Sequence, residues 1–299
     1  MPTLFRNYTK IAGITDDYFK VRSFLLNLGY SEFVYARWDW MATHGYLDKT
    51  AVGKIGLWEA ENEIVGVATF DTRLGIGYCL THPDYRELKE KMLKYAEDHL
   101  STPDGFEVVI PDTDLRFQEI AMRAGYVGSE EKEADSVFYI DKTLLDYELP
   151  EGFRITTLED DFNLLQYRRV LWKGFNHELK GEGLFTFSSE DELSAKEEML
   201  RPNVDLDLKI AVVSPEENFV SYCGMWYDPA VEFALVEPVA TDPEYRGLGL
   251  GKAAVLEGVR RVGLRGAKMA LVGSSQQFYY SIGFRPFATS TNWKKKQPK

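Results

Sequence analysis

The sequence predicts two α/β (α+β) domains in tandem, and three observations lead to this expectation. The chain has 299 residues, which by the usual size of a domain is enough for two. Short apolar runs typical of strands alternate with amphipathic stretches typical of helices, such as Leu88–Leu100 and Ala253–Leu264. A motif in the first half of the chain also recurs in the second half. We therefore expect two copies of one unit that combines helices with a sheet.

The repeated motif sets the alignment of the two copies. Thr81–Leu88 parallels Thr241–Leu248 at an offset of 241 − 81 = 160 residues. Each motif follows a strand-like run and precedes a helix that ends near a glycine; these runs are Ile64–Phe70 and Tyr222–Tyr227, and the glycines are Gly125 and Gly283. The glycines differ by 283 − 125 = 158 residues, and a difference of two is ordinary loop variation.

The boundary between the copies is expected where regular structure breaks. Ile140 ends a strand-like run, and Pro150-Glu151-Gly152 interrupts the pattern, which places the boundary within Asp141–Gly152. The predicted domains are residues 1–146 and 151–299.

The second domain is predicted to begin with a strand at Phe153–Ile155 and a helix at Asp161–Trp172. An apolar run at Ala267–Val272 indicates a later strand. The lysine-rich tail Lys294–Lys299 is expected to be a solvated end.

Composition excludes several functional classes. Lys plus Arg total 35 and Asp plus Glu total 47, so the net charge is 35 − 47 = −12, which argues against a nucleic-acid partner and suits cationic amines. Cys79 and Cys223 each lie in an apolar run and are expected to be buried strand residues, and with four histidines lacking ligand spacing they predict no metal site. Neither a secretion signal nor an apolar run of about 18 residues is present, so we expect a cytoplasmic protein without a membrane partner.

The stretch Val239–Lys252 carries the clearest functional signal. It predicts a short strand, a turn at Pro243, a glycine-dense loop and the first turn of a helix. Glycines allow successive backbone N–H groups to converge on one ligand, and the start of a helix adds further unpaired N–H groups that suit a phosphate. The helix dipole alone contributes only about 0.3–1 kcal/mol, so several amides must act together. The pattern predicts a pyrophosphate site.

Two common phosphate loops do not fit this stretch. A nucleoside-triphosphate P-loop requires a glycine at the position of Arg246 and Ser or Thr at the position of Ala253. A dinucleotide fingerprint matches Gly249, Gly251 and Ala254, but the loop between strand and helix is too long and no acid follows at the expected distance.

The remaining pattern, Arg246-x-x-Gly249-x-Gly251, resembles the acyl-CoA loop of the GNAT superfamily of N-acyltransferases. A second block, Phe278–Pro286, resembles the helix of that family that ends in Gly-Phe, with Tyr279 four residues before Gly283. With the internal repeat, the chain resembles a tandem GNAT protein along nearly its whole length.

The resemblance implies a mixed, mostly antiparallel sheet in each domain, splayed to admit the pantetheine arm of acetyl-CoA. It implies that the backbone N–H of Val239 polarises the acyl carbonyl and that Thr241 reaches the pantetheine amides. The pyrophosphate would be held by Arg246, Gly247, Leu248, Gly249, Leu250, Gly251 and Lys252. Lys252 is equally consistent with a solvated helix face.

The resemblance makes Tyr279 the general acid for the departing thiolate, unless Tyr279 only packs in its helix and Tyr280 substitutes. Glu237 lies two residues before Val239, hence on the same strand face by simple alternation, and is the candidate base. It is also consistent with an ion-paired strand carboxylate, and Glu232 is a weaker candidate.

The first copy lacks these features. In place of Gly247, Gly249, Gly251 and Tyr279 it has Glu87, Lys89, Lys91 and Ala121. We expect a degenerate, structural domain that helps to shape the substrate groove.

The acceptor is less well defined. The aromatic residues Tyr35, Trp38 and Trp40 suit core packing better than a substrate groove, and Phe175–Glu178 follows the first helix of the second copy, where the family often builds its acceptor site. The predicted function is acetyl-CoA-dependent N-acetyltransfer to a primary amine of a small molecule by direct transfer. The alternative is a non-catalytic acyl-CoA-binding sensor or interaction protein.

Overall fold

The computed structural model describes residues 2–141 and 146–295, and its contacts divide the chain into two compact units. The first unit comprises Met1–Asp135 and Pro286–Lys299, and the second comprises Ser136–Arg285. These limits differ from the continuous segments 1–146 and 151–299, because the last strand of each sequence copy joins the sheet of the other unit.

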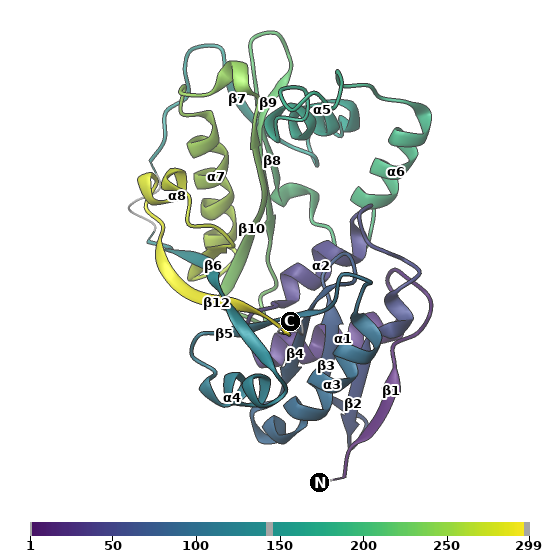
Figure 1. The fold of residues 1–299 in the computed structure, drawn as a ribbon. Coiled ribbons are helices and arrows are strands. Elements are labelled where there is room, and N and C mark those ends of the chain that lie inside the picture. The colour runs from purple at the N-terminus through teal and green to yellow at the C-terminus, as the bar shows by residue number, and fades with distance from the viewer. Residues whose placement is uncertain (1, 142–145, 296–299) are drawn as a thin grey trace. The chain divides into compact units, whose positions relative to one another are not determined.

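The first unit is a mixed sheet with helices (Figure 1). In their order across the sheet, its strands are β1 (Leu4–Asn7), β2 (Gly56–Ala60), β3 (Glu63–Phe70), β4 (Ile76–Thr81), β5 (Glu107–Pro111), β12 (Arg285–Lys295) and β6 (Tyr126–Tyr139). Its helices are α1 (Asp16–Leu28), α2 (Tyr35–Thr43), α3 (Lys89–Leu100) and α4 (Leu115–Arg123), with 3₁₀ helices at Val52–Lys54 and Pro83–Leu88. β4 and β5 pair in parallel, whereas β1–β2, β2–β3, β3–β4 and β5–β12 are antiparallel.

The second unit repeats this plan. Its sheet runs from the end of β6 through β11 (Met269–Val272), β10 (Phe233–Thr241), β9 (Phe219–Trp226) and β8 (Lys209–Val213) to β7 (Arg154–Thr157). Its helices are α5 (Leu164–Gly174), α6 (Ser189–Met199), α7 (Leu250–Leu264) and α8 (Gln277–Ser281), with 3₁₀ helices at Leu206–Leu208 and Pro243–Tyr245. β10 and β11 pair in parallel, and the other pairs are antiparallel. The prediction of a mixed, mostly antiparallel sheet is confirmed.

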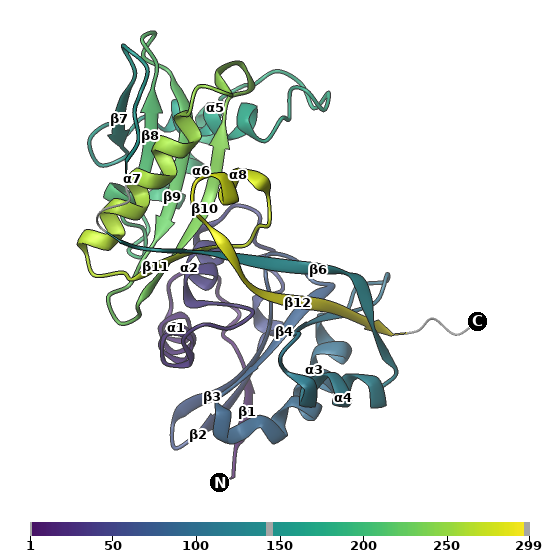
Figure 2. The same ribbon diagram turned by 90° about the vertical axis from the view of Figure 1, so that its left-hand side faces the viewer.

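The strand exchange involves β6 and β12, which are neighbours in Figure 2. β12 pairs with β5 of the first unit, from Ser290 opposite Pro111 to Lys294 opposite Glu107. The last residues of β6 pair with β11 of the second unit, with Ser136 opposite Val272. Lys294 and Lys295 are exposed, as expected of a solvated tail, although they belong to β12, while 296–299 lie outside the described residues.

The elements expected from the sequence are largely present. The apolar runs at 64–70, 222–227 and 267–272 correspond to β3, β9 and β11, and the helices expected at 88–100, 161–172 and 253–264 correspond to α3, α5 and α7. Tyr35 and Trp38 are buried core residues. Cys79 and Cys223 are buried free thiols in β4 and β9, as expected.

Two apolar layers enclose the sheet of the second unit. One layer packs α7 against alternate residues of the central strands, including Ile210, Cys223 and Met225. The other packs α5 and α6 against the opposite face, where Tyr167 contacts Tyr222 with ring centroids 5.1 Å apart. α7 and α5 therefore cover opposite faces of this sheet (Figure 1).

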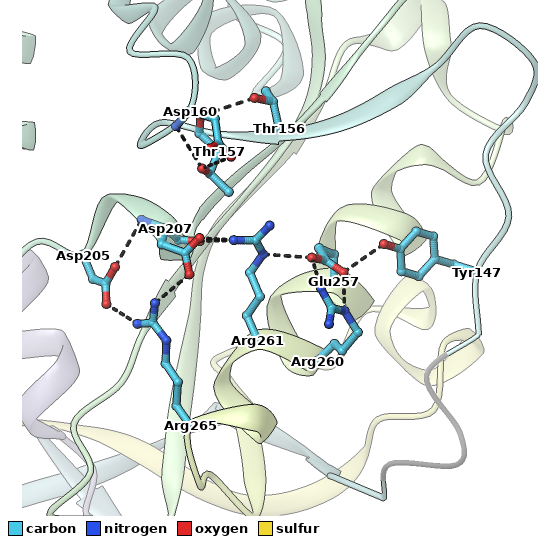
Figure 3. Close-up of polar contacts among 10 residues, drawn as sticks. All are labelled: Tyr147, Thr156, Thr157, Asp160, Asp205, Asp207, Glu257, Arg260, Arg261 and Arg265. Atoms are coloured by element: carbon cyan, nitrogen blue, oxygen red, sulfur yellow. Dashed lines mark hydrogen bonds and ion pairs between the residues drawn. The ribbon is translucent and has the colours of Figure 1, made fainter.

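A polar network anchors α7 (Figure 3). The buried carboxylate of Glu257 accepts hydrogen bonds from Tyr147 at 2.9 Å, Arg260 at 2.7 and 2.6 Å, and Arg261 at 2.8 Å. Arg261 also pairs with Asp207. Burial favours the neutral carboxyl, but these hydrogen bonds hold the pKa of Glu257 below its ordinary value. The network fixes the position of the helix whose first turn carries the glycine motif.

Candidate active site

The sheet of the second unit opens between β10 and β11. The two strands pair only from Phe233 opposite Met269 to Leu235 opposite Leu271, while β10 continues to Thr241. β11 itself ends at Val272, so one edge of β10 beyond Leu235 has no partner strand in the described residues, as the expected splay requires.

The register of β10 decides which backbone groups face this opening. The amide of Asp242 donates to the carbonyl of Val220 on β9 at 2.9 Å. Backbone groups of an antiparallel strand alternate between its two sides, so the groups of Ala240 also face β9, whereas those of Val239 and Thr241 face away from it. The N–H of Val239 therefore points away from β9, on the side where the family resemblance implies an oxyanion donor.

An irregularity in β10 lies just before Val239. The register with β9 shifts between Val236 and Val239, and the Glu237–Pro238 peptide is cis. Val236 and Val239 both pack on the α7 face, so simple alternation does not fix the face of Glu237. Gly224 is required opposite this irregularity, because a Cβ there would lie 2.5 Å from the carbonyl oxygen of Glu237.

The glycine motif forms an open turn before α7. Gly247 and Gly249 have φ angles of 81° and 79°, which favour glycine, and no atom lies within 4 Å of a Cβ built at either residue. Gly251 in the first turn packs closely, since its Cβ would lie 3.0 Å from Thr241 Oγ1 and 3.3 Å from Phe278. Within the described residues, no backbone acceptor is recorded for the amides of 247–252. The turn thus presents a series of available N–H groups, with Leu248 between the two left-handed glycines and Leu250 and the exposed Lys252 in the first turn of α7.

The side chain of Arg246 binds groups of the protein itself. Its guanidinium donates to the carbonyl of Thr241 at 3.2 Å, to the carbonyl of Gly174 at 2.8 Å and to Asn176 Oδ1 at 2.8 Å. A direct contact of this side chain with a pyrophosphate would require these bonds to break. In this structure Arg246 instead ties the loop to the end of α5.

A buried acid at the start of the loop was not anticipated from the sequence. Asp242 is fully buried and lies 3.2 Å from Lys173 Nζ and 3.6 Å from Arg169 Nη2 on α5, while its Oδ1 accepts from the amide of Glu244 at 3.2 Å. The sequence signal that could have indicated this buried acid is its place directly before Pro243, together with two cationic residues four positions apart on a helix. Asp242 fixes the exit of β10 against α5.

Tyr279 is buried in α8 on the α7 face of the sheet. Its ring packs edge-on against Phe278 and Phe284, with centroids 5.0 and 5.5 Å away. Burial raises the pKa of its phenol, and electrostatic repulsion from Cys223 and Glu237 raises this pKa further. The neighbouring Tyr280 is half-buried.

The alternative base, Glu232, lies just before the opposite end of β10. It is exposed and forms an ion pair with Lys268, while the amides of Lys268 and Met269 donate to its carbonyl. Glu232 is therefore remote along the strand from Val239 and has a structural partner.

The segment after α5 folds back on itself. His177 Nδ1 lies 2.7 Å from Glu182 Oε2, and its ring stacks on Trp172 with centroids 4.4 Å apart. Glu178 accepts from the amide of Phe185 at 2.9 Å. These contacts order the segment where the family resemblance expects part of the acceptor site.

No cluster of three or more His, Cys, Asp or Glu side chains in the described residues could hold a metal ion. None of the helices in 2–141 and 146–295 combines the length and apolar character that crossing a bilayer demands.

The parallel pair β10–β11, the glycine turn at a helix start and the buried tyrosine lie in the part of the chain that a family model matches. Residues 172–284 match the model of the Acetyltransferase (GNAT) family. The C-terminal half thus contains a GNAT domain, and this family implies an acyl-CoA co-substrate for that domain.

Solved structures share the fold over the full length. A GCN5-related N-acetyltransferase from Sphaerobacter thermophilus has 17% identity and a TM-score of 0.59, with 99% of this chain and 96% of that chain covered. A tandem GNAT protein from the clavulanic acid biosynthesis pathway has 12% identity and a TM-score of 0.59, with both chains fully covered at 100%. A GNAT-family acetyltransferase from Colwellia psychrerythraea has 11% identity and a TM-score of 0.58, covering 98% and 100%. At these identities the likeness concerns the fold alone. No curated protein matches the chain in sequence.

Proposed function

We propose that the protein is an acetyl-CoA-dependent N-acetyltransferase that transfers the acetyl group directly to a primary amine of a small molecule. One observation carries the proposal: beyond Leu235 the edge of β10 that carries the Val239 amide has no strand partner in the described residues, and Tyr279 lies in the apolar layer against which Val239 packs. This arrangement supports an oxyanion donor and a proton donor in one site.

The second unit would hold the coenzyme along the free edge of β10. The amides of 247–252 would bind the diphosphate at the start of α7, and Thr241 would contact the pantetheine arm. The amide of Val239 would donate to the thioester oxygen as negative charge develops there, and one such donor contributes about 2.7–4 kcal/mol to the transition state.

The chemistry needs two proton transfers. The acceptor nitrogen forms a bond to the acyl carbon and loses a proton, and the carbon–sulfur bond breaks to release a thiolate that gains one. Because burial raises its pKa, Tyr279 stays protonated at neutral pH and can donate to the thiolate. Glu237, which lies in β10 two residues before Val239, would accept the amine proton directly or through water.

Direct transfer is supported by the state of the nearby thiol. Cys223 is fully buried in β9 opposite Val239, and burial raises its pKa to about 12. A thiolate is the reactive form of cysteine, so Cys223 is poorly suited to carry a covalent acyl group.

The net charge of the protein supports an amine as the acceptor of the acetyl group. The net charge of −12 attracts cationic amines over long range, and no feature of the composition suits nucleic acid. Two buried free thiols are compatible with a reducing compartment such as the cytoplasm.

The test is release of free thiol from acetyl-CoA in the presence of polyamines, amino acids, aminoglycosides and aminothiols, each with a matched alcohol as the control acceptor. We expect thiol release that depends on one amine class and an equal amount of acetylated amine. Tight acetyl-CoA binding without release for any amine would instead favour a sensor.

A further inference from the structure

The first unit contains a counterpart of the opening between β10 and β11. β4 and β5 pair in parallel only at Ile76–Glu107 and Gly77–Val108, although β4 continues to Thr81. The amide of His82 donates to Val65 on β3 at 2.9 Å, so by alternation the backbone groups of Cys79 face away from β3 and into this opening. With the offset of 160 residues, Cys79 corresponds to Val239 (239 − 79 = 160).

A lysine side chain fills this opening. Lys89 is only 7% exposed, and its ammonium donates to the carbonyl of Cys79 at 2.5 Å. Lys89 corresponds to Gly249 (249 − 89 = 160), the residue that leaves open space in the second unit. The Lys89 side chain therefore fills the opening of the first unit, and the second unit has a glycine, without a side chain, at the corresponding position.

Charge and shape around Lys89 are matched to an ammonium. Its Nζ lies 3.8 Å from Glu32 Oε1 and 3.7 Å from Asp114 Oδ2, and 4.4 Å from the centroid of the Phe117 ring. Glu32 Oε1 is buried without a hydrogen-bond partner, so the ammonium is its nearest compensating charge in the described ion pairs. Burial raises the pKa of Glu32, and Lys89 is the group that opposes this shift.

The backbone of the first unit also lacks the turn that presents free amides. The 3₁₀ helix Pro83–Leu88 leads directly into α3, and Leu88 at its junction has φ −69°. In the second unit a loop containing two left-handed glycines separates the 3₁₀ helix from α7. Nothing equivalent to the glycine turn exists before α3.

We propose that Lys89 is an internal ligand of the first unit, whose ammonium occupies the β4–β5 opening in place of an acyl-CoA, and that this opening is a site for a primary alkylammonium. The comparison with acyl-CoA rests on the proposed function of the second unit. The ammonium site rests on the contacts of Lys89 alone, so the two can fail separately.

Truncation followed by chemical rescue tests the site. Lys89→Ala removes three carbons and the nitrogen, which n-propylammonium replaces. We expect the variant to melt below the wild type and n-propylammonium to raise its Tm in a saturable way by about 2–4 °C beyond any effect on wild type. Lys91→Ala is the matched control, because Lys91 is an exposed lysine of the same helix and should show no such rise. Tetramethylammonium at equal ionic strength and 1-propanol should rescue less. Equal effects of n-propylammonium and tetramethylammonium on Lys89→Ala would overturn the proposal.

A second pair of variants applies if Lys89→Ala does not fold. Lys89→Met keeps the stem but leaves Glu32 without its counter-charge, and adding Glu32→Gln removes the uncompensated charge. We expect the double variant to have a higher Tm than Lys89→Met. A double variant no more stable than Lys89→Met would refute the pairing.

Discussion

The glycine turn gives the sharpest test of the cofactor site. Gly249→Glu places a carboxylate at the start of α7, next to the position proposed for the diphosphate, and Gly249→Gln adds nearly the same volume without the charge. A Cβ at this residue has no neighbour within 4 Å, so neither variant is crowded at its first side-chain atom. Both variants must adopt φ 79°, which costs a residue with a Cβ about 1–2 kcal/mol in stability.

The difference between the two variants isolates the charge. Two unit charges 4 Å apart repel by about 1 kcal/mol at the dielectric constant of water and about 4 kcal/mol at an effective value of 20. We therefore expect Gly249→Glu to bind acetyl-CoA between about 5-fold and about 10³-fold more weakly than Gly249→Gln.

Calorimetric titration with acetyl-CoA measures this difference, with melting temperature as a check that both variants fold equally well. Raising the salt concentration should reduce the difference in acetyl-CoA affinity between Gly249→Glu and Gly249→Gln. The loop is exposed, so salt screens the repulsion between the carboxylate and the diphosphate. Lys91→Glu, which adds a negative charge at an exposed residue of the first unit, should leave the affinity at the wild-type value. Equal affinities of Gly249→Glu and Gly249→Gln at low salt would refute the diphosphate site.

Three further predictions concern the second unit. Tyr279→Phe should lower kcat for an accepted amine by about 10²–10⁴-fold with little change in acetyl-CoA affinity. Gly174→Ala should lower Tm, since its Cβ would lie 2.7 Å from the Cβ of Ala240 and overpacking costs about 1–3 kcal/mol. Arg168→Met should destabilise the protein more at pH 8 than at pH 5: burial raises the pKa of Glu198 and Arg168 opposes this, so without the arginine more stability is lost as the pH rises through the folded-state pKa.

Each of these has a control. Tyr280→Phe should retain most of the activity, and a similar loss in both phenylalanine variants would remove the specific acid role of Tyr279. Gly45→Ala, where no atom lies within 4 Å of the new Cβ, should leave Tm almost unchanged. Arg154→Met breaks an exposed pair with Glu217 and should show no pH-dependent loss; a pH-independent loss in Arg168→Met would contradict the assignment to Glu198.

The repeat and the glycine motif were readable because they depend on local chemistry. Positive φ angles at Gly247 and Gly249 follow from a turn that any side chain would strain, and the helix after it follows from amphipathic spacing. The same reasoning placed Cys79 and Cys223 in buried strands.

Other features depend on contacts distant in sequence. The irregularity at Glu237 arises where its carbonyl approaches Gly224, and the anchoring of Arg246 on Gly174 needs a fold before it can be foreseen. A lysine in an amphipathic helix is expected to be exposed. Lys89 is nevertheless buried, because Glu32, far from it in the sequence, supplies a counter-charge.

The exchange of β6 and β12 imposes an order on folding during synthesis. The ribosome makes β5 early, but its antiparallel partner β12 emerges only after the entire second half has been translated. Until then a nascent chain carries an open strand edge, which is a template for wrong pairing with other chains. The first unit, although translated first, can complete its sheet only when translation has passed the second.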